Sequence, residues 1–133
     1  MNPLYAVVAE RAGHRCEYCH APEAVFNFPF EVEHVIPPLL GGSDDEVNLA
    51  LACRSYNVFK GSVIVAVDSD TATEVALFHP RKDNWNLHFR IEPETGAITG
   101  LSPQGRTTAI QLRMNSNTQL AARRQWIVLD LFP

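Results

Sequence analysis

The sequence predicts a single domain of the α+β class. Helical patterns lie at both ends of the chain, and between them the order of elements is strand, loop, strand, helix. A length of 133 residues is usual for one compact domain, and no linker is apparent. The composition, 46% hydrophobic and 20% charged, is that of a globular protein. We therefore expect residues 1–133 to share one core.

The first predicted element is a helix over residues 3–12. Its apolar positions recur at helical spacing and are Leu4, Val7 and Val8. Asn2 is the expected N-cap, Pro3 suits the first helical position, and Gly13 follows the end.

Two strands and a helix are predicted in the middle of the chain. Residues 30–36 alternate in polarity and are followed by the pair Pro37 and Pro38, which ends a strand. A glycine-rich loop leads to a second strand at 48–53. Residues 54–60 are long enough for a two-turn helix that stops at Gly61.

The pattern is weaker beyond residue 62. Residues 88–92 and 97–101 flank a turn and predict a hairpin. Helical spacing then predicts one helix around 107–114 and another around 120–131. We expect Trp85 and Phe89 to be core residues rather than base-stacking ones. The expected environment of Arg123 and Arg124 is a solvated helix face.

Four motifs with chemically active side chains follow one another in the first half of the chain. They are Cys16-x-x-Cys19, Glu33-His34-Val35-Ile36-Pro37, Gly41-Gly42-Ser43-Asp44-Asp45 before Asn48-Leu49, and Cys53-Arg54-Ser55-Tyr56-Asn57-Val58-Phe59-Lys60-Gly61. Histidine is the side chain best suited to take a proton from water at neutral pH. A hard cation such as Mg²⁺ prefers oxygen ligands, which Glu33 and Asn57 offer. The set suits hydrolysis of a phosphodiester.

This ordered set strongly resembles the HNH endonuclease family over residues 11–61. The resemblance implies a ββα-metal HNH core, preceded by the N-terminal helix and followed by residues 62–133 as a C-terminal extension of hairpin and helices. It implies His34 as general base, with Glu33 and Asn57 holding one divalent metal ion, Mg²⁺ or Mn²⁺.

The same resemblance gives two further residues a role. Asn48 is expected to brace the loop between the two strands. Lys60 lies three residues after Asn57, so on a helix both side chains can face the same side, where Lys60 could hold a phosphate oxygen.

The adjacent positions of Glu33 and His34 raise a geometric difficulty. Neighbouring residues on a flat strand point to opposite faces, so both cannot face one site there. The proline pair that follows suggests that the strand ends or twists at this point.

The sequence departs from the family at the cysteines. Many relatives complete a four-thiolate zinc site with a second Cys-x-x-Cys, but here Tyr56 stands where the fourth cysteine would be. Closing the ββα unit should bring Cys16, Cys19 and Cys53 together as a degraded zinc site. Tyrosine is a poor zinc ligand at neutral pH, so we expect weak or substoichiometric zinc, unless water or His20 takes the fourth position.

Charge and cysteine usage bear on partners and compartment. The net charge is −4, but residues 1–75 carry 4 basic and 11 acidic side chains and residues 76–133 carry 7 and 4. The second half is therefore expected to bind much of a phosphate backbone, DNA first and RNA not excluded. Three cysteines argue against a secreted disulfide framework, and no apolar run is long enough for a membrane, so a cytoplasmic protein is expected. No signal indicates an oligomeric state.

Two other functions remain open. A non-catalytic nucleic-acid-binding module could keep the HNH fold while its zinc site decays. A thiol redox protein using Cys16 and Cys19 would normally place its Cys-x-x-Cys at the start of a helix beside a βαβ unit, a pattern this chain lacks. A binding module needs none of the set Glu33, His34, Asn48 and Asn57, so the presence of all four favours the nuclease.

Overall fold

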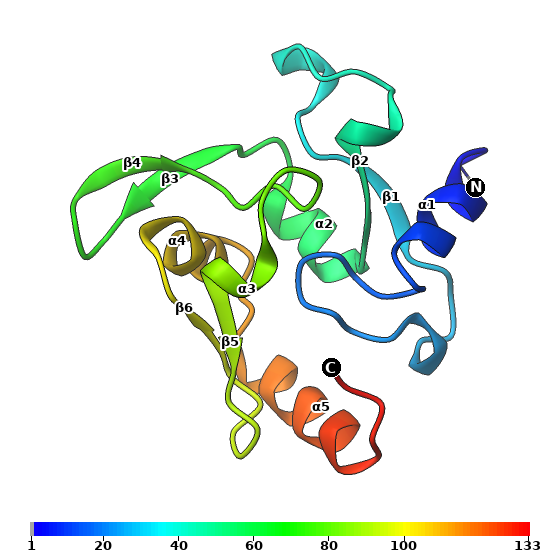
Figure 1. The fold of residues 1–133 in the computed structure, drawn as a ribbon, viewed down its shortest axis with the longest axis vertical. Coiled ribbons are helices and arrows are strands. Elements are labelled where there is room, and N and C mark those ends of the chain that lie inside the picture. The colour runs from blue at the N-terminus through cyan, green and yellow to red at the C-terminus, as the bar shows by residue number, and fades with distance from the viewer. Residues whose placement is uncertain (1) are drawn as a thin grey trace.

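The computed structural model describes residues 2–133 as an α+β fold, which confirms the predicted class (Figure 1). Three antiparallel sheets of two strands each lie among short helices. Within this part of the chain, no helix combines the length and apolar character needed to cross a membrane.

The N-terminal helix α1 spans Tyr5–Arg11 and begins two residues later than predicted. Asn2 caps the turn before the helix, because its Oδ1 accepts the backbone N–H of Leu4 at 2.7 Å. Gly13 follows the helix at φ 64°, a left-handed conformation that glycine adopts at low cost.

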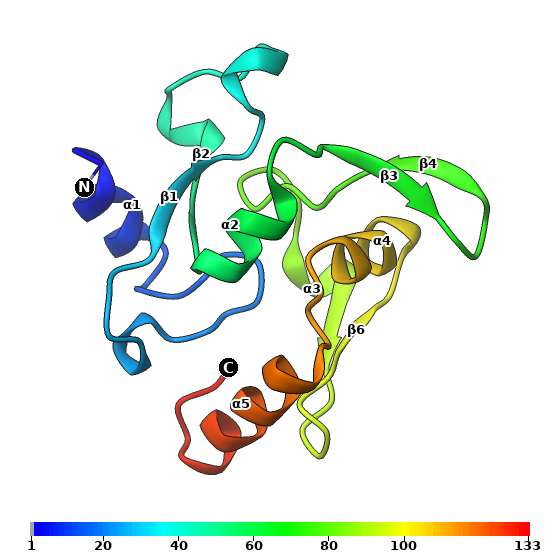
Figure 2. The ribbon, with the colours of Figure 1, turned by 180° about the vertical axis from the view of Figure 1, so that it is seen from behind.

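The central hairpin pairs β1 (Glu31–His34) with β2 (Leu49–Ala52), placing Glu33 opposite Ala50 and His34 opposite Leu49. Helix α2 (Arg54–Lys60) follows directly and ends at Gly61, which has φ 51°. In both views α1 and α2 lie on either side of this hairpin (Figures 1 and 2). The predicted order of strand, loop, strand and helix is therefore present.

The C-terminal part contains the predicted hairpin and both predicted helices. The bounds of its elements are β3 Val65–Asp68, β4 Thr73–Ala76, α3 Trp85–His88, β5 Phe89–Ile91, β6 Ile98–Gly100, α4 Pro103–Gln111 and α5 Asn117–Val128. Ser102 and Ser116 cap α4 and α5 by accepting backbone N–H groups. The hairpin of β3 and β4 and the short helix α3 were not predicted.

One hydrophobic cluster joins the two halves of the chain. Cys16, Cys19 and Tyr56 from the first half pack in the same cluster as Phe89 and Leu112 from the second. Trp85 is partly buried against this cluster, so both aromatic residues of the 85–89 segment serve the core as predicted. Residues from both halves of the chain therefore contribute to one buried cluster.

The prediction for Arg123 was wrong. Its side chain is completely buried, whereas the neighbouring Arg124 is exposed. The guanidinium of Arg123 donates to the backbone oxygens of Gly96 at 2.6 Å and Met114 at 2.9 Å. The first bond connects α5 to the turn between β5 and β6, and the second connects it to the segment between α4 and α5. Both make burial of the charge tolerable.

Candidate functional site

His34 is the last residue of β1 and is paired with the carboxylate of Asp44, a residue of the glycine-rich motif to which the sequence assigned no role. Its Nε2 lies 2.7 Å from Oδ1 of Asp44, and the imidazole is 29% exposed. A carboxylate at Nε2 fixes a proton on that nitrogen, which leaves Nδ1 with a lone pair. The arrangement provides a histidine with a defined tautomer and access to solvent.

Asn48 holds the loop that carries Asp44. Its Oδ1 accepts the backbone N–H of Ile36, and its Nδ2 donates to the backbone oxygens of Ile36 at 2.9 Å and Ser43 at 2.8 Å. The loop also requires Gly42, since a Cβ there would lie 1.6 Å from the carbonyl oxygen of Ile36. Asn48 thus positions the loop against the end of β1.

Glu33 is buried between two polar side chains. Tyr18 donates its hydroxyl to the Glu33 carboxylate, and Nζ of Lys60 lies 3.9 Å from Glu33 Oε2. Burial raises the pKa of Glu33 to about 7, against the opposing effects of the Lys60 charge and the Tyr18 hydrogen bond. Lys60 is 2% exposed and donates to the backbone oxygen of Val35 at 2.8 Å. Its ammonium therefore faces the interior.

Asn57 contacts a different carboxylate. Its Nδ2 donates to Glu31, while its Oδ1 accepts no hydrogen bond within residues 2–133. Glu31 and Glu33 both contact α2, so they share one face of β1, and His34 points to the other face. The strand stays regular to its end at His34, and the geometric difficulty raised by the sequence is not relieved.

These positions decide how a divalent ion would fit. The oxygens of Glu33 and Asn57 are of the type that Mg²⁺ or Mn²⁺ prefers. As placed, however, Glu33 is bound by Tyr18 and Lys60, and Glu33, His34 and Asn57 do not converge on one point. The donor chemistry fits the ion, but the described geometry does not.

The three cysteines form a buried cluster, as predicted. Their sulfur atoms all lie within 4.8 Å of one another, and each is a free thiol. Tyr56 is completely buried in the same hydrophobic cluster, in keeping with a ring that packs over the thiols. His20 lies outside the group of sulfur ligands and instead stacks on Trp85 at a centroid distance of 4.2 Å. The cluster offers a metal three ligands.

The pKa values of the thiols are shifted in different directions. Burial raises the pKa of Cys19, but hydrogen bonds from Cys16 and Cys53 outweigh it and bring this pKa well below its usual range. The pKa of Cys53 is raised by its hydrogen bonds to the other two thiols and by burial. The buried charge of Arg123 further favours the Cys19 thiolate, and Arg123 Nη2 donates to the hydroxyl of Tyr56 at 3.3 Å. Tyr56 therefore links the thiols to α5.

The comparisons with known proteins agree with the motif order. Residues 16–62 match the model of the family described as HNH endonuclease. The resemblance found in the sequence is thereby confirmed for this segment, whose family consists generally of metal-using nucleases. The searches of curated proteins and of solved structures returned no match.

Proposed function

We propose that this protein is a metal-dependent endonuclease that hydrolyses DNA phosphodiester bonds with His34 as general base. The observation that carries the proposal is the HNH match over residues 16–62, which contains His34 and the loop that supplies Asp44. A histidine with one nitrogen bound by a carboxylate and the other free suits proton removal from water.

His34 and Asp44 account for the proton transfer. Asp44 accepts the N–H at Nε2, so Nδ1 takes the proton of the attacking water. The Asp44 carboxylate then stabilises the imidazolium that forms. Asn48 maintains the pair indirectly by holding the loop of Asp44 on the end of β1.

In this proposal, Glu33 and Asn57 are the residues that would hold the divalent ion, Mg²⁺ or Mn²⁺. When bound, such an ion supplies positive charge for the phosphoryl and leaving oxygens. In the described arrangement the Glu33 carboxyl group is held by Tyr18 and Lys60. We assign Lys60 to the buried contact with Glu33 rather than to a phosphate, since its ammonium is buried.

A non-catalytic nucleic-acid-binding module remains the second candidate, and one observation favours it. Glu33, His34 and Asn57 face two sides of β1, whereas a binding module needs no convergence of these groups.

A supercoiled-plasmid assay separates the two candidates. The nuclease proposal predicts nicked or linear product with Mg²⁺ or Mn²⁺ and none with EDTA, in protein purified free of other nucleases. Retarded plasmid without cleavage in either metal would favour the binding module.

A further inference from the structure

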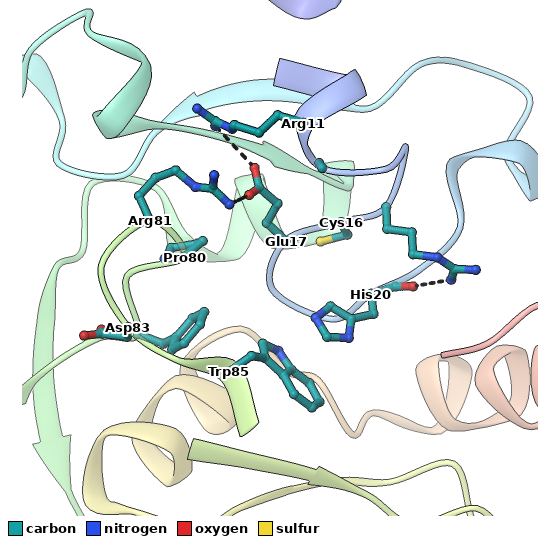
Figure 3. A pocket seen from close by; sticks show the side chains of 11 residues that line it. Arg11, Cys16, Glu17, His20, Pro80, Arg81, Asp83 and Trp85 are labelled. Atoms are coloured by element: carbon teal, nitrogen blue, oxygen red, sulfur yellow. Dashed lines mark hydrogen bonds and ion pairs between the residues drawn. The ribbon is translucent and has the colours of Figure 1, made fainter. Parts of the chain in front are cut away.

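A cavity of about 350 Å³ lies outside the proposed catalytic residues, between the end of α1, the Cys16–His20 turn and the segment before α3 (Figure 3). We call it the arginine pocket. The side chains used below are Arg11, Arg15, Glu17, His20, Arg81 and Trp85. A volume of this size lies within the usual range for ligand sites, which begins at about 300 Å³.

The guanidinium groups of Arg11 and Arg81 both form ion pairs with the carboxylate of Glu17. Arg11 lies 3.7 Å from Glu17 Oε2, and Arg81 contacts Glu17 Oε1 (Figure 3). Glu17 Oε2 also accepts the backbone N–H of Leu51 at 2.8 Å. Burial lowers the pKa of Arg81, and the charge of Arg11 lowers it further. The pocket thus holds two cations that repel each other across one shared anion.

A third cation adds to this imbalance. Arg15 donates to the backbone oxygens of His20 and Leu131, each at 3.1 Å, and pairs with no carboxylate in the described chain. The other acidic residue of the lining, Asp83, points away from the Glu17 side of the cavity and accepts the backbone N–H of His79 at 2.8 Å (Figure 3). The cavity therefore has an excess of positive charge.

The opposite wall of the cavity is flat and aromatic. His20 and Trp85 stack with an interplanar angle of 29° and lie across the cavity from Arg11 (Figure 3). Trp85 is fixed because its Nε1 donates to the backbone oxygen of Tyr18 at 2.8 Å. The face of a ring in such a stack suits a sugar or a base.

We propose that the arginine pocket binds a phosphate group of a nucleic-acid strand, with the adjoining sugar or base against the His20 ring. Arginine guanidinium groups bind phosphate oxygens, and an anion here relieves the repulsion between Arg11 and Arg81. Arg11 also donates to the backbone oxygen of Leu49, the register partner of His34. The pocket thus lies at the β2 edge of the hairpin whose β1 edge carries His34. The choice of a nucleic-acid strand as the ligand rests on the proposed function.

Trp85 provides a direct readout of binding. The chain has two tryptophans, so Trp126→Phe leaves Trp85 as the only one. Its fluorescence is titrated in EDTA with inorganic phosphate, a mononucleotide and a single-stranded 12-mer. We expect a saturable change, with the strand binding at least about tenfold more tightly than the mononucleotide because more phosphates are contacted.

Two substitutions that add the same charge localise the site. Ala12 lines the pocket, and Ala24 is exposed and outside it. Ala12→Glu should weaken strand affinity about tenfold, through repulsion of the phosphate, and Ala24→Glu less than about twofold. Arg81→Gln should lower the slope of log affinity against log salt for the single strand by about 0.7, the effect of one phosphate contact. Thermal melting of each variant identifies one that fails to fold.

The remaining outcomes overturn the proposal. If no ligand changes the Trp85 fluorescence in a saturable way, the pocket does not bind phosphate. If the mononucleotide binds as tightly as the strand, the phosphate recognised here is not that of a nucleic-acid strand. Equal effects of Ala12→Glu and Ala24→Glu place the binding elsewhere. Because the titration needs neither metal nor cleavage, a failed plasmid assay leaves its result intact, and cleavage without a Trp85 response refutes the pocket alone.

Discussion

Glu33 and His34 are neighbours in the chain, yet they meet opposite environments. Alternation along β1 places Glu33 in the interior beside Lys60 and leaves His34 at the surface beside Asp44. A buried carboxylate is stabilised in its neutral form, whereas an exposed imidazole can exchange protons with water. The sequence motif identified Glu33 and His34, but the pairing of β1 with β2 determines which of them is buried.

The raised pKa of Glu33 predicts that stability falls as pH rises. The folded state binds the Glu33 proton up to about pH 7, whereas an unfolded chain releases it near the reference value of about 4.3. The folded state therefore holds more protons within this window, and the free energy of unfolding decreases across it by up to about 4 kcal/mol.

Glu33→Gln tests that prediction. Urea unfolding at pH 5, 6, 7 and 8 in EDTA should give a flatter pH dependence for Glu33→Gln than for the parent. Glu94→Gln is the control, because Glu94 lies at an exposed turn. Parallel curves for Glu33→Gln and the parent would show that Glu33 is ionised in the folded protein throughout.

At the scale of elements, the start of α2 meets the Cys16–Cys19 turn at the thiol cluster. Tyr56 fills the place of a fourth ligand and contacts Arg123 on α5. A four-thiolate site holds zinc with apparent energies of about 10–16 kcal/mol, and loss of one ligand forfeits a sizeable part. Purified protein should therefore contain well below stoichiometric zinc.

Tyr56→Cys should restore a strong zinc site. We expect this variant to bind zinc stoichiometrically and to melt at a higher temperature only when zinc is present. Tyr56→Phe is the control, because it keeps the ring and adds no thiol. Stoichiometric zinc in the unmodified chain, with a large loss of stability on chelation, would point to a replacement ligand.

Basic residues after position 75 are expected to contribute to DNA binding, but they are not equivalent. Arg106 is bound to Asp68 and Asp70, so its replacement disturbs an internal ion pair. Lys82 is exposed and lines a cavity beside Gly42 and Asn48. It is therefore the cleaner probe.

Lys82→Gln should weaken DNA binding and lower the slope of log affinity against log salt by about 0.9, the effect of one phosphate contact on a duplex. Fluorescence anisotropy with a labelled duplex between 50 and 300 mM salt measures both, with Arg124→Gln on exposed α5 as the control. An unchanged slope would move the binding surface away from Lys82.

Prediction of elements from the sequence succeeded where local signals were strong. The proline pair after β1 cannot continue the strand, and Gly61 favours the end of α2, so both ends were predictable from the sequence. The β3 and β4 strands are four residues long, and their alternating valines at Val65 and Val67 are largely exposed, so no apolar face marks them. Their pairing depends on contacts with α4 rather than on their own pattern.

At the scale of the whole molecule, the two halves of the chain are held by one core. Phe78 packs against Tyr18, Trp85 donates to the backbone oxygen of Tyr18, and Arg81 reaches Glu17 across the same boundary. Several partners of the site residues could not be predicted from the sequence. Asp44, Tyr18 and Arg123 have no motif spacing to the residues they contact, and only folding brings them together.

The shared core predicts that residues 1–62 do not fold alone. A fragment cut after residue 62 loses the Phe78, Phe89 and Leu112 part of the hydrophobic cluster. We expect it to unfold without a cooperative transition in urea, whereas the full chain gives one. A sharp transition and dispersed amide signals from the fragment would mean that the extension is a separate unit.

The role of His34 is the central claim, and matched histidine substitutions test it most directly. His14 is exposed at φ 55° and bonded to Glu23, and asparagine tolerates that conformation, so His14→Asn is the control for His34→Asn. Rates of plasmid nicking in Mg²⁺ and Mn²⁺ are compared for the parent and both variants. We expect a loss of at least about 10²-fold for His34→Asn, the usual contribution of a general base, and a near-parental rate for His14→Asn. A His34→Asn protein that nicks DNA at the parental rate would show that His34 is not the general base.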